Sequence, residues 1–170
     1  MGKKIVIVGG VAGGATAAAR LRRLDESAEI VMIERTGFVS YANCGLPYYV
    51  GGVIKEKSAL TLQSPASFKS RFNIDVRVSS EVTAIDRAAK TVSVRNLATG
   101  EEYTENYDKL ILSPGAKAMV PDTPGVHSRR VLKLRTVEDA LEMRRIVEEE
   151  KPERAVVVGG GFIGLEAAEN

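Results

Sequence analysis

Two apolar runs, each ending in a pair of glycines, stand out in the pattern of hydrophobic and polar positions. Residues 4–8 (KIVIV) precede Gly9-Gly10, and residues 154–158 (RAVVV) precede Gly159-Gly160. A helical pattern rich in small residues follows each pair. A short apolar run that enters a glycine turn and then a helix is typical of a buried parallel strand that opens a nucleotide-binding unit. The repeat therefore predicts two such units in one chain.

The pattern between the two glycine turns completes the first unit. A helix is expected over roughly 12–24 and a second strand over 29–34 (EIVMIE), which gives a βαβ arrangement with the first run. Ser64-Pro65 predicts the start of a short helix, with serine as the N-cap and proline at the first helical position.

The middle of the chain has the alternating apolar and polar positions that are typical of short strands. Runs at about 74–78, 81–86 and 91–96, with a turn at 99–100 before another, predict a small antiparallel meander. A further strand is expected at 110–112, where it closes on the turn Ser-Pro-Gly-Ala.

A boundary between domains is expected in the Pro/Gly-rich segment 114–125. Thr136 then predicts the N-cap of a helix that ends near Lys151-Pro152, and a strand is expected over 155–158. The fold class is α/β: a Rossmann-like domain over 1–115 with a small antiparallel meander insertion, followed over 116–170 by the start of a second Rossmann-like domain.

Composition excludes several classes of function. The chain has 170 residues, of which 44% are hydrophobic and 27% charged, so it can bury a core, and its net charge of +2 gives no general reason to expect nucleic acid or a membrane surface as a partner. No stretch approaches the roughly 18 apolar residues of a membrane span. A single cysteine excludes an internal disulfide framework and a multi-cysteine metal site. We expect a cytoplasmic protein without a metal.

The first glycine loop, 9–14 (GGVAGG), departs from the dinucleotide fingerprint at its second glycine position, which is Val11. The physical requirements are still met if Gly9 makes the turn and Gly14 lets helix and strand approach. The amides of Ala12 and Gly13, at the positive end of the helix, would then bind a pyrophosphate. We assign this loop to FAD.

Glu34 ends the second expected strand, where a carboxylate can accept hydrogen bonds from both ribose hydroxyls of a dinucleotide. The alternative is a glycine turn followed by an ordinary surface glutamate. We place Glu34 and its neighbour Arg35 in the FAD site.

The second loop, 159–164 (GGGFIG), satisfies all three fingerprint positions with Gly159, Gly161 and Gly164. By the same argument this loop binds the pyrophosphate of NADH or NADPH. The residue that chooses between the two is expected after Asn170, so the preference stays open.

Cys44 lies in the loop 41–48 (YANCGLPY), about ten residues after Glu34. An extended chain of that length could carry it from the adenosine end of FAD toward the flavin. There its thiolate could pass electrons to or from a sulfur substrate. A buried structural cysteine is the alternative.

Four segments resemble the pyridine nucleotide-disulfide oxidoreductases, in particular the coenzyme A-disulfide reductases and related NADH oxidases and persulfide or polysulfide reductases. They are residues 5–24 (IVIVGGVAGGATAAARLRRL), 40–52 (SYANCGLPYYVGG), 113–116 (SPGA) and 156–166 (VVVGGGFIGLE). The valine at position 11 is usual in this subgroup. The resemblance covers essentially the whole chain and implies that 1–115 is part of a FAD-binding domain and 116–170 the start of an NAD(P)-binding domain.

The resemblance also implies roles for particular residues. Ser113 and Gly115 would lie near the FAD pyrophosphate or ribityl chain, Val82 would contact the adenine through its backbone, and Phe162, with Ile163, would lie at the nicotinamide pocket. Packing is the alternative role for each. Coenzyme A contacts carry over to Thr16, Arg20, Arg23, Ser40 and Asn43, and Asn43 is also expected among the cofactor-binding residues. Arginines on the first helix suit phosphates, although they could equally form a solvated helix face.

Three departures from the patterns of related enzymes qualify these roles. A lysine position of the family is Phe72 here, so we assign its phosphate contact to the neighbouring Arg71. Tyr41 replaces a phenylalanine. Glutathione reductase-type relatives carry a pair of cysteines, whereas Cys44 has no second cysteine in this chain.

The resemblance implies that Cys44 alternates between a thiolate and a mixed disulfide with coenzyme A, or a persulfide or sulfenate, while FAD relays electrons from NAD(P)H. The predicted enzyme reduces coenzyme A disulfide, a coenzyme A persulfide or polysulfide, and is a homodimer. Three alternatives stay open: an NADH oxidase or peroxidase that uses a cysteine sulfenate, a flavin electron-transfer protein, and a non-catalytic fragment. We expect 170 residues alone to be inactive.

Overall fold

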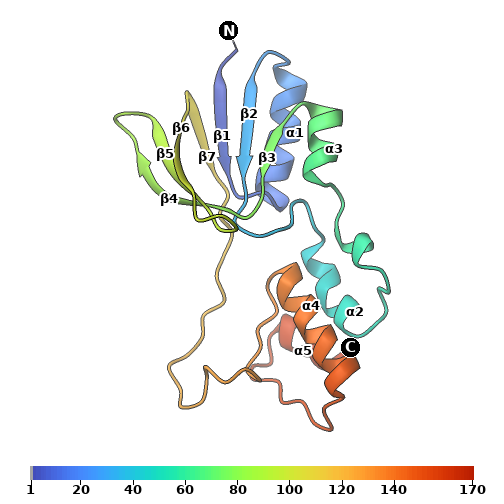
Figure 1. Cartoon of the computed structure of the whole chain (residues 1–170). Helices are drawn as coiled ribbons and strands as arrows, with labels where there is room; N and C mark the ends of the chain where they lie inside the picture. Colours follow the sequence, from blue (N-terminus) through green and yellow to red (C-terminus); the bar gives the residue numbers. More distant parts are fainter. Residues whose placement is uncertain (1) are drawn as a thin grey trace. The chain divides into compact units, whose positions relative to one another are not determined.

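The computed structural model describes residues 2–170 and contains two compact units (Figure 1). One unit comprises the chain up to Tyr41 together with 63–115, and the other comprises 42–62 together with 116–170. The loop with Cys44 therefore belongs to the same unit as the glycine loop at 159–164. The division into a FAD-binding domain over 1–115 and an NAD(P)-binding start over 116–170 stays a prediction.

A four-stranded parallel sheet organises the first unit. Its strands are β1 (Lys4–Val8), β2 (Glu29–Ile33), β3 (Asp75–Arg77) and β7 (Lys109–Leu112), in the order β3-β2-β1-β7. The two apolar runs recognised in the sequence at 4–8 and 29–34 are thus neighbours, and their connection is the helix predicted between them.

Both faces of this sheet are covered, which explains the continuous apolar runs of β1 and β2. Ile5 and Ile7 of β1 point to one core, with α1 (Ala12–Leu24) and α3 (Pro65–Phe72), whereas Val6 between them points to the other. Figure 1 shows the two helices on one side of the sheet. Ser64 caps α3 as predicted, since its hydroxyl accepts a hydrogen bond from the Ser67 amide at 3.1 Å.

The antiparallel sheet β4-β5-β6 covers the opposite face. Its strands are β4 (Ser80–Asp86), β5 (Thr91–Asn96) and β6 (Glu102–Asn106). The run at 74–78 was predicted as part of this meander, and that prediction was wrong. β3 pairs in parallel with β2 instead, because Ile74, which is fully buried, packs into the core beneath the helices.

A cluster of charges links the two sheets of the first unit. The Glu105 carboxylate on β6 accepts from Lys4 of β1 at 2.6 Å and from Arg77 of β3. Burial alone would raise the pKa of Glu105, but the hydrogen bonds from Lys4 and Arg77 outweigh it and hold this pKa below its usual value. The hydrogen bond to Glu105 likewise raises the pKa of Lys4. The sequence contains no periodic signal for this cluster, because its members meet only through strand pairing.

The second unit is helical. It contains a short 3-10 turn at Asn43–Gly45, α2 (Leu46–Val50), a second 3-10 turn at Lys57–Leu60, α4 (Val137–Arg145), a π-helical extension at Ile146–Glu150 and α5 (Phe162–Glu169). The helix α2 packs against α4 and α5. As predicted, Thr136 caps α4, and the helical segment ends before Lys151.

The strand expected over 155–158 is not formed. Among the described residues none pairs with this segment, and Val156 and Val158 are 86% and 93% exposed. A parallel strand needs hydrogen-bonded neighbours, so an apolar run without them stays irregular. Within residues 2–170 no helix is both long and apolar enough to cross a membrane.

Candidate functional site

The first glycine loop makes a sharp turn at the carboxyl end of β1. Gly9 has φ of +95°, and a Cβ added there would lie 2.0 Å from the Ser113 carbonyl oxygen. A Cβ added at Gly14 would lie 1.8 Å from the Gly9 carbonyl oxygen. Both positions therefore require glycine, one for its backbone conformation and one for the close approach of α1 to the turn.

The amino terminus of α1 is open to a ligand. Its N-cap residue is Val11, which has no side-chain oxygen, and no side chain caps the first turn. The exposed Ala12 and Gly13 contribute first-turn amides, and a Cβ added at Gly13 would meet nothing closer than the Ser113 hydroxyl at 3.3 Å. Uncapped amides at the positive end of a 13-residue helix suit an anionic group. The residues present fit the pyrophosphate of a dinucleotide.

Glu34 is held beside this loop rather than extended into solvent. The residue is only 6% exposed, and its Oε2 accepts from the Gly10 amide at 2.7 Å. Its Oε1 accepts from the Thr36 amide and lies 2.8 Å from the Thr36 hydroxyl. The alternative interpretation of Glu34 as an ordinary surface glutamate is therefore excluded. The sequence reasoning missed Thr36, although a hydroxyl two residues after a strand-ending carboxylate is a readable signal for such a turn.

Further predicted residues of the first unit gather around the same edge of the sheet. The Ser113 amide donates to the Val8 carbonyl at 2.7 Å, and the Ser40 amide donates to the Gly10 carbonyl at 2.8 Å. Ser40 has a positive φ of 48°. The loop between β2 and residue 41 thus closes over the glycine turn. Val82, on strand β4 of the meander, packs against the core between the two sheets of the first unit. Arg35 forms an ion pair with Glu81 at 3.6 Å.

The arginines of α1 have different environments. Thr16, Arg20 and Arg23 follow one another at helical spacing and are exposed. Arg22 differs, because its guanidinium donates to the carbonyl of Phe72, the last residue of α3, at 2.8 Å and to that of Glu26, which follows α1, at 2.6 Å. The structure therefore separates a structural arginine from two that are available to a ligand. Arg71 on α3 is also exposed.

Cys44 is an exposed, free thiol in the second unit, so a buried structural cysteine is excluded. It lies in the 3-10 turn that precedes α2. The amide of its neighbour Asn43 is close to a cation, since Arg135 Nη1 lies 3.3 Å from Asn43 Oδ1. The same guanidinium donates to the Ala116 carbonyl at 3.2 Å. The thiol is thus accessible, and the turn that contains it is hydrogen-bonded through Asn43 to Arg135, far along the chain.

The second glycine loop repeats the backbone geometry of the first. Gly159 has φ of +112°, and a Cβ added at Gly164 would lie 2.2 Å from the Gly159 carbonyl oxygen. Gly161 is the N-cap of α5 without a side-chain cap, and Phe162 and Ile163 are 87% and 58% exposed. The turn forms although the strand before it does not, because its geometry is set by local glycines.

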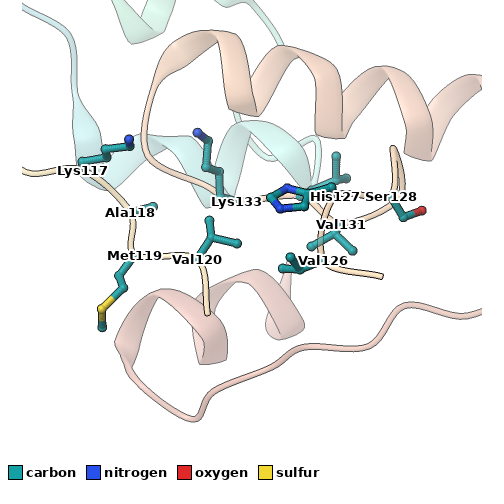
Figure 2. A pocket seen from close by; sticks show the side chains of 10 residues that line it. Lys117, Ala118, Met119, Val120, Val126, His127, Ser128, Val131 and Lys133 are labelled. Carbon is teal, nitrogen blue, oxygen red and sulfur yellow. The ribbon is translucent and has the colours of Figure 1, made fainter. Parts of the chain in front are cut away.

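A hollow in the second unit lies away from these residues. A space of about 640 Å³ is bounded by the irregular chain between β7 and α4 (Figure 2), and Met119, which lines it, is 94% exposed. The predicted site residues do not line this hollow. The candidate residues lie instead at the first glycine loop in one unit, and at the second glycine loop and Cys44 in the other. In the described part of the chain, no group of three or more His, Cys, Asp or Glu could hold a metal ion.

Comparison with known proteins gives consistent results. The family model described as pyridine nucleotide-disulphide oxidoreductase matches residues 3–170. A coenzyme A disulfide reductase of Staphylococcus haemolyticus is 42% identical over 168 residues, which are 99% of this chain and 38% of that protein.

Solved structures agree with this assignment. The crystal structure of reduced Bacillus anthracis CoADR-RHD has a TM-score of 0.97 and 52% identity, covering 99% of this chain and 30% of that one. An NAD-dependent persulfide reductase from A. fulgidus has a TM-score of 0.92 and 41% identity, covering 98% and 31%. A water-forming NADH oxidase from Lactobacillus brevis has a TM-score of 0.90 and 32% identity, covering 98% and 36%. The chain thus spans about a third of the length of these relatives.

Proposed function

Because the chain belongs to the pyridine nucleotide-disulphide oxidoreductase family, we propose that it contributes the FAD loop and the redox cysteine of an NAD(P)H-dependent flavoenzyme that reduces a sulfur substrate. The observation that carries this proposal is the accessible Cys44 thiol in a chain whose two glycine loops have the geometry that a dinucleotide pyrophosphate requires. The similarity to coenzyme A disulfide reductases favours coenzyme A disulfide, or a related persulfide, as the substrate class.

The residues of the first unit would bind FAD in defined roles. The amides of Ala12 and Gly13 would donate to its pyrophosphate, with Ser113 alongside, and Glu34 would accept from the ribose. Gly10 and Thr36 orient this carboxylate before any ligand arrives, which lowers the entropic cost of binding. FAD, when bound, relays the two electrons of a nicotinamide hydride to a sulfur acceptor. The second loop, through Gly159, Gly161 and Gly164, would bind that nicotinamide dinucleotide.

Cys44 would exchange with the substrate. Its thiolate attacks one sulfur of coenzyme A disulfide, which forms a mixed disulfide and releases one coenzyme A thiolate. Two electrons from NAD(P)H then cleave the mixed disulfide, which returns the Cys44 thiolate and, with a proton, frees the second coenzyme A thiol. A lone cysteine is sufficient for this cycle because the substrate contributes the second sulfur.

The phosphates of coenzyme A would meet the exposed face of α1. Thr16, Arg20 and Arg23 lie on this face, and an arginine guanidinium can bind a phosphate through two parallel hydrogen bonds. Arg71, Ser40 and Asn43 complete the proposed contacts. Arg22 is not one of the proposed phosphate contacts, because its guanidinium donates to backbone carbonyls.

An NADH oxidase or peroxidase is the second candidate, since a water-forming NADH oxidase has the same fold over this region. Cys44 would then cycle through a sulfenate. A flavin electron-transfer protein that does not use Cys44 covalently, and a fragment without activity of its own, are the remaining alternatives. We further expect a cytoplasmic homodimer.

The test is mass spectrometry of the protein as its gene encodes it, purified without reductant. An adduct of coenzyme A size on Cys44, removed by dithiothreitol, together with FAD released on denaturation, is the expected result. An oxygen-sized increment alone would favour the oxidase or peroxidase. A Cys44→Ser variant with unchanged turnover would favour the electron-transfer protein, and a chain that retains no FAD would favour the fragment.

A further inference from the structure

The segment that carries Cys44 is too short to hold its own conformation. The thiol lies in a three-residue turn, and α2, which follows directly, has only five residues. Isolated helices shorter than about 12 residues are marginal in water. The position of Cys44 therefore depends on what α2 packs against, and within the second unit this is chiefly α4.

Arg144, a side chain of α4, makes several polar contacts to α2 and the loop that follows it. Arg144 Nη1 lies 3.2 Å from the Tyr49 carbonyl oxygen, 2.9 Å from that of Ile54 and 3.2 Å from that of Lys55. Its guanidinium also lies over the Tyr49 ring, 4.5 Å from the centroid. The side chain is only 17% exposed. A cation at the carbonyl end of a helix is favourable, and here it also joins α2 to the loop that follows.

Side-chain packing connects the carbonyls that Arg144 contacts to the turn that contains Cys44. A Cβ added at Gly45, the residue after Cys44, would meet Ile54 Cδ1 at 3.2 Å and Leu60 Cδ2 at 3.3 Å. The loop therefore folds back so that Ile54 lies against the turn that holds the thiol. The Ala42 amide, on the other side of Cys44, donates to the Leu60 carbonyl at 2.8 Å. Arg144 thus anchors the backbone of Ile54, whose side chain packs on the residue next to Cys44.

We propose that Arg144 is the positioning residue of Cys44, acting from α4 through α2 and Ile54. Arg135, which contacts Asn43 immediately before the cysteine, constrains the other end of the same segment. The guanidinium does not touch the reacting sulfur. It restricts where the thiol can be when the substrate arrives. This inference rests on the proposed function, in which Cys44 is the group that exchanges with the sulfur substrate.

The test compares three variants of the FAD-loaded protein: Arg144→Met, Arg144→Lys and Arg145→Met. Arg145 is the matched control because it is the next residue of α4 and, among residues 2–170, its ion pairs are to Glu142, Glu149 and Glu150 of the same helical segment. The readouts are kcat and KM for coenzyme A disulfide with NADH or NADPH, and hydrogen exchange of the amides of 46–55. Among these amides, those of Gly51, Gly52 and Ile54 donate to carbonyls within the segment.

Arg144→Met should speed exchange in 46–55 by about tenfold or more, because charged hydrogen bonds to carbonyls are lost. It should lower kcat by about tenfold to a hundredfold, the usual effect of misplacing a reacting group by an ångström, with a smaller change in KM. Lysine at 144 keeps the cation and can still reach one carbonyl, so Arg144→Lys should recover part of kcat. Arg145→Met should resemble the parent protein in both readouts.

Several results would overturn the inference. One is faster exchange in Arg144→Met with unchanged kcat per folded molecule, and another is the same behaviour in Arg144→Met and Arg145→Met. If the methionine variant does not fold, as judged by circular dichroism, the comparison of Arg144→Lys with Arg145→Lys takes its place. Full turnover in Cys44→Ser would instead refute the proposed function, and the exchange data would still report whether Arg144 orders the segment.

Discussion

The two adjacent glycines of the first helical turn of α1 should respond to alanine in opposite directions. Gly13 and Gly14 are both in the helix, so Gly→Ala gains helix propensity at each, by about 0.5–1 kcal/mol. Only Gly14 lies against backbone, since its added Cβ would be 1.8 Å from the Gly9 carbonyl oxygen. At Gly13 the nearest atom is the Ser113 hydroxyl at 3.3 Å, the end of a small side chain that can rotate.

The magnitudes follow from these contacts. Ordinary contact distances require the helix and the turn at Gly14 to separate by roughly 1.5 Å, and overpacking of this kind costs about 1–3 kcal/mol. After the gain in propensity, Gly14→Ala should lower the free energy of unfolding by about 1–2 kcal/mol. Gly13→Ala should leave it unchanged or raise it by up to about 1 kcal/mol. For a chain of this size the expected changes in Tm are about 2–8 °C downward and up to about 4 °C upward.

The assay is thermal and urea unfolding of the parent chain and both variants, followed by circular dichroism without added cofactor. Without FAD, the assay measures packing alone. Both variants keep the backbone amides of positions 12 and 13, which are proposed to contact the pyrophosphate. Equal stabilities of the two variants, or a larger loss at Gly13, would refute the argument that the close approach of α1 to the turn is what requires glycine at position 14.

Other predictions concern the first unit. Glu105→Gln should destabilise the chain by about 2 kcal/mol, because two partly buried cationic partners lose a charged acceptor; unfolding in urea measures this, with the exposed Glu102→Gln as the control. Since the folded pKa of Glu105 lies below its ordinary value of 4.5, its contribution is present above that pH and is lost as pH falls through the folded pKa, so the acid slope of Tm should flatten in Glu105→Gln. Arg22→Met should cost about 1–2 kcal/mol through lost bonds to carbonyls at two helix ends. Arg23→Met should leave Tm unchanged, and equal losses for the two arginines would contradict the assignment.

Much of the candidate site could be predicted from local sequence. The turn at Gly9 and its repeat at Gly159 follow from glycines at fixed spacing after an apolar run, and this geometry forms in the second copy even without a strand. Glu34 was found because it ends the next apolar run. What no pattern along the chain indicates is that the Gly10 amide, 24 residues earlier, also holds this carboxylate, because a hydrogen bond between residues so far apart leaves no local signal.

The elements whose causes are local could be predicted from the sequence. Helix α1, the caps at Ser64 and Thr136, and the two glycine turns all depend on residues within a few positions of one another. Tertiary structure alone decided that β3 joins the parallel sheet beside β2 and that 155–158 forms no strand, because strand pairing depends on which neighbours are present. It also decided that the Cys44 segment packs on a helix some ninety residues away, where Arg144 contacts Tyr49 and Ile54. Contacts of that separation are fixed by packing and by the closing of long loops, which a pattern along the chain does not encode.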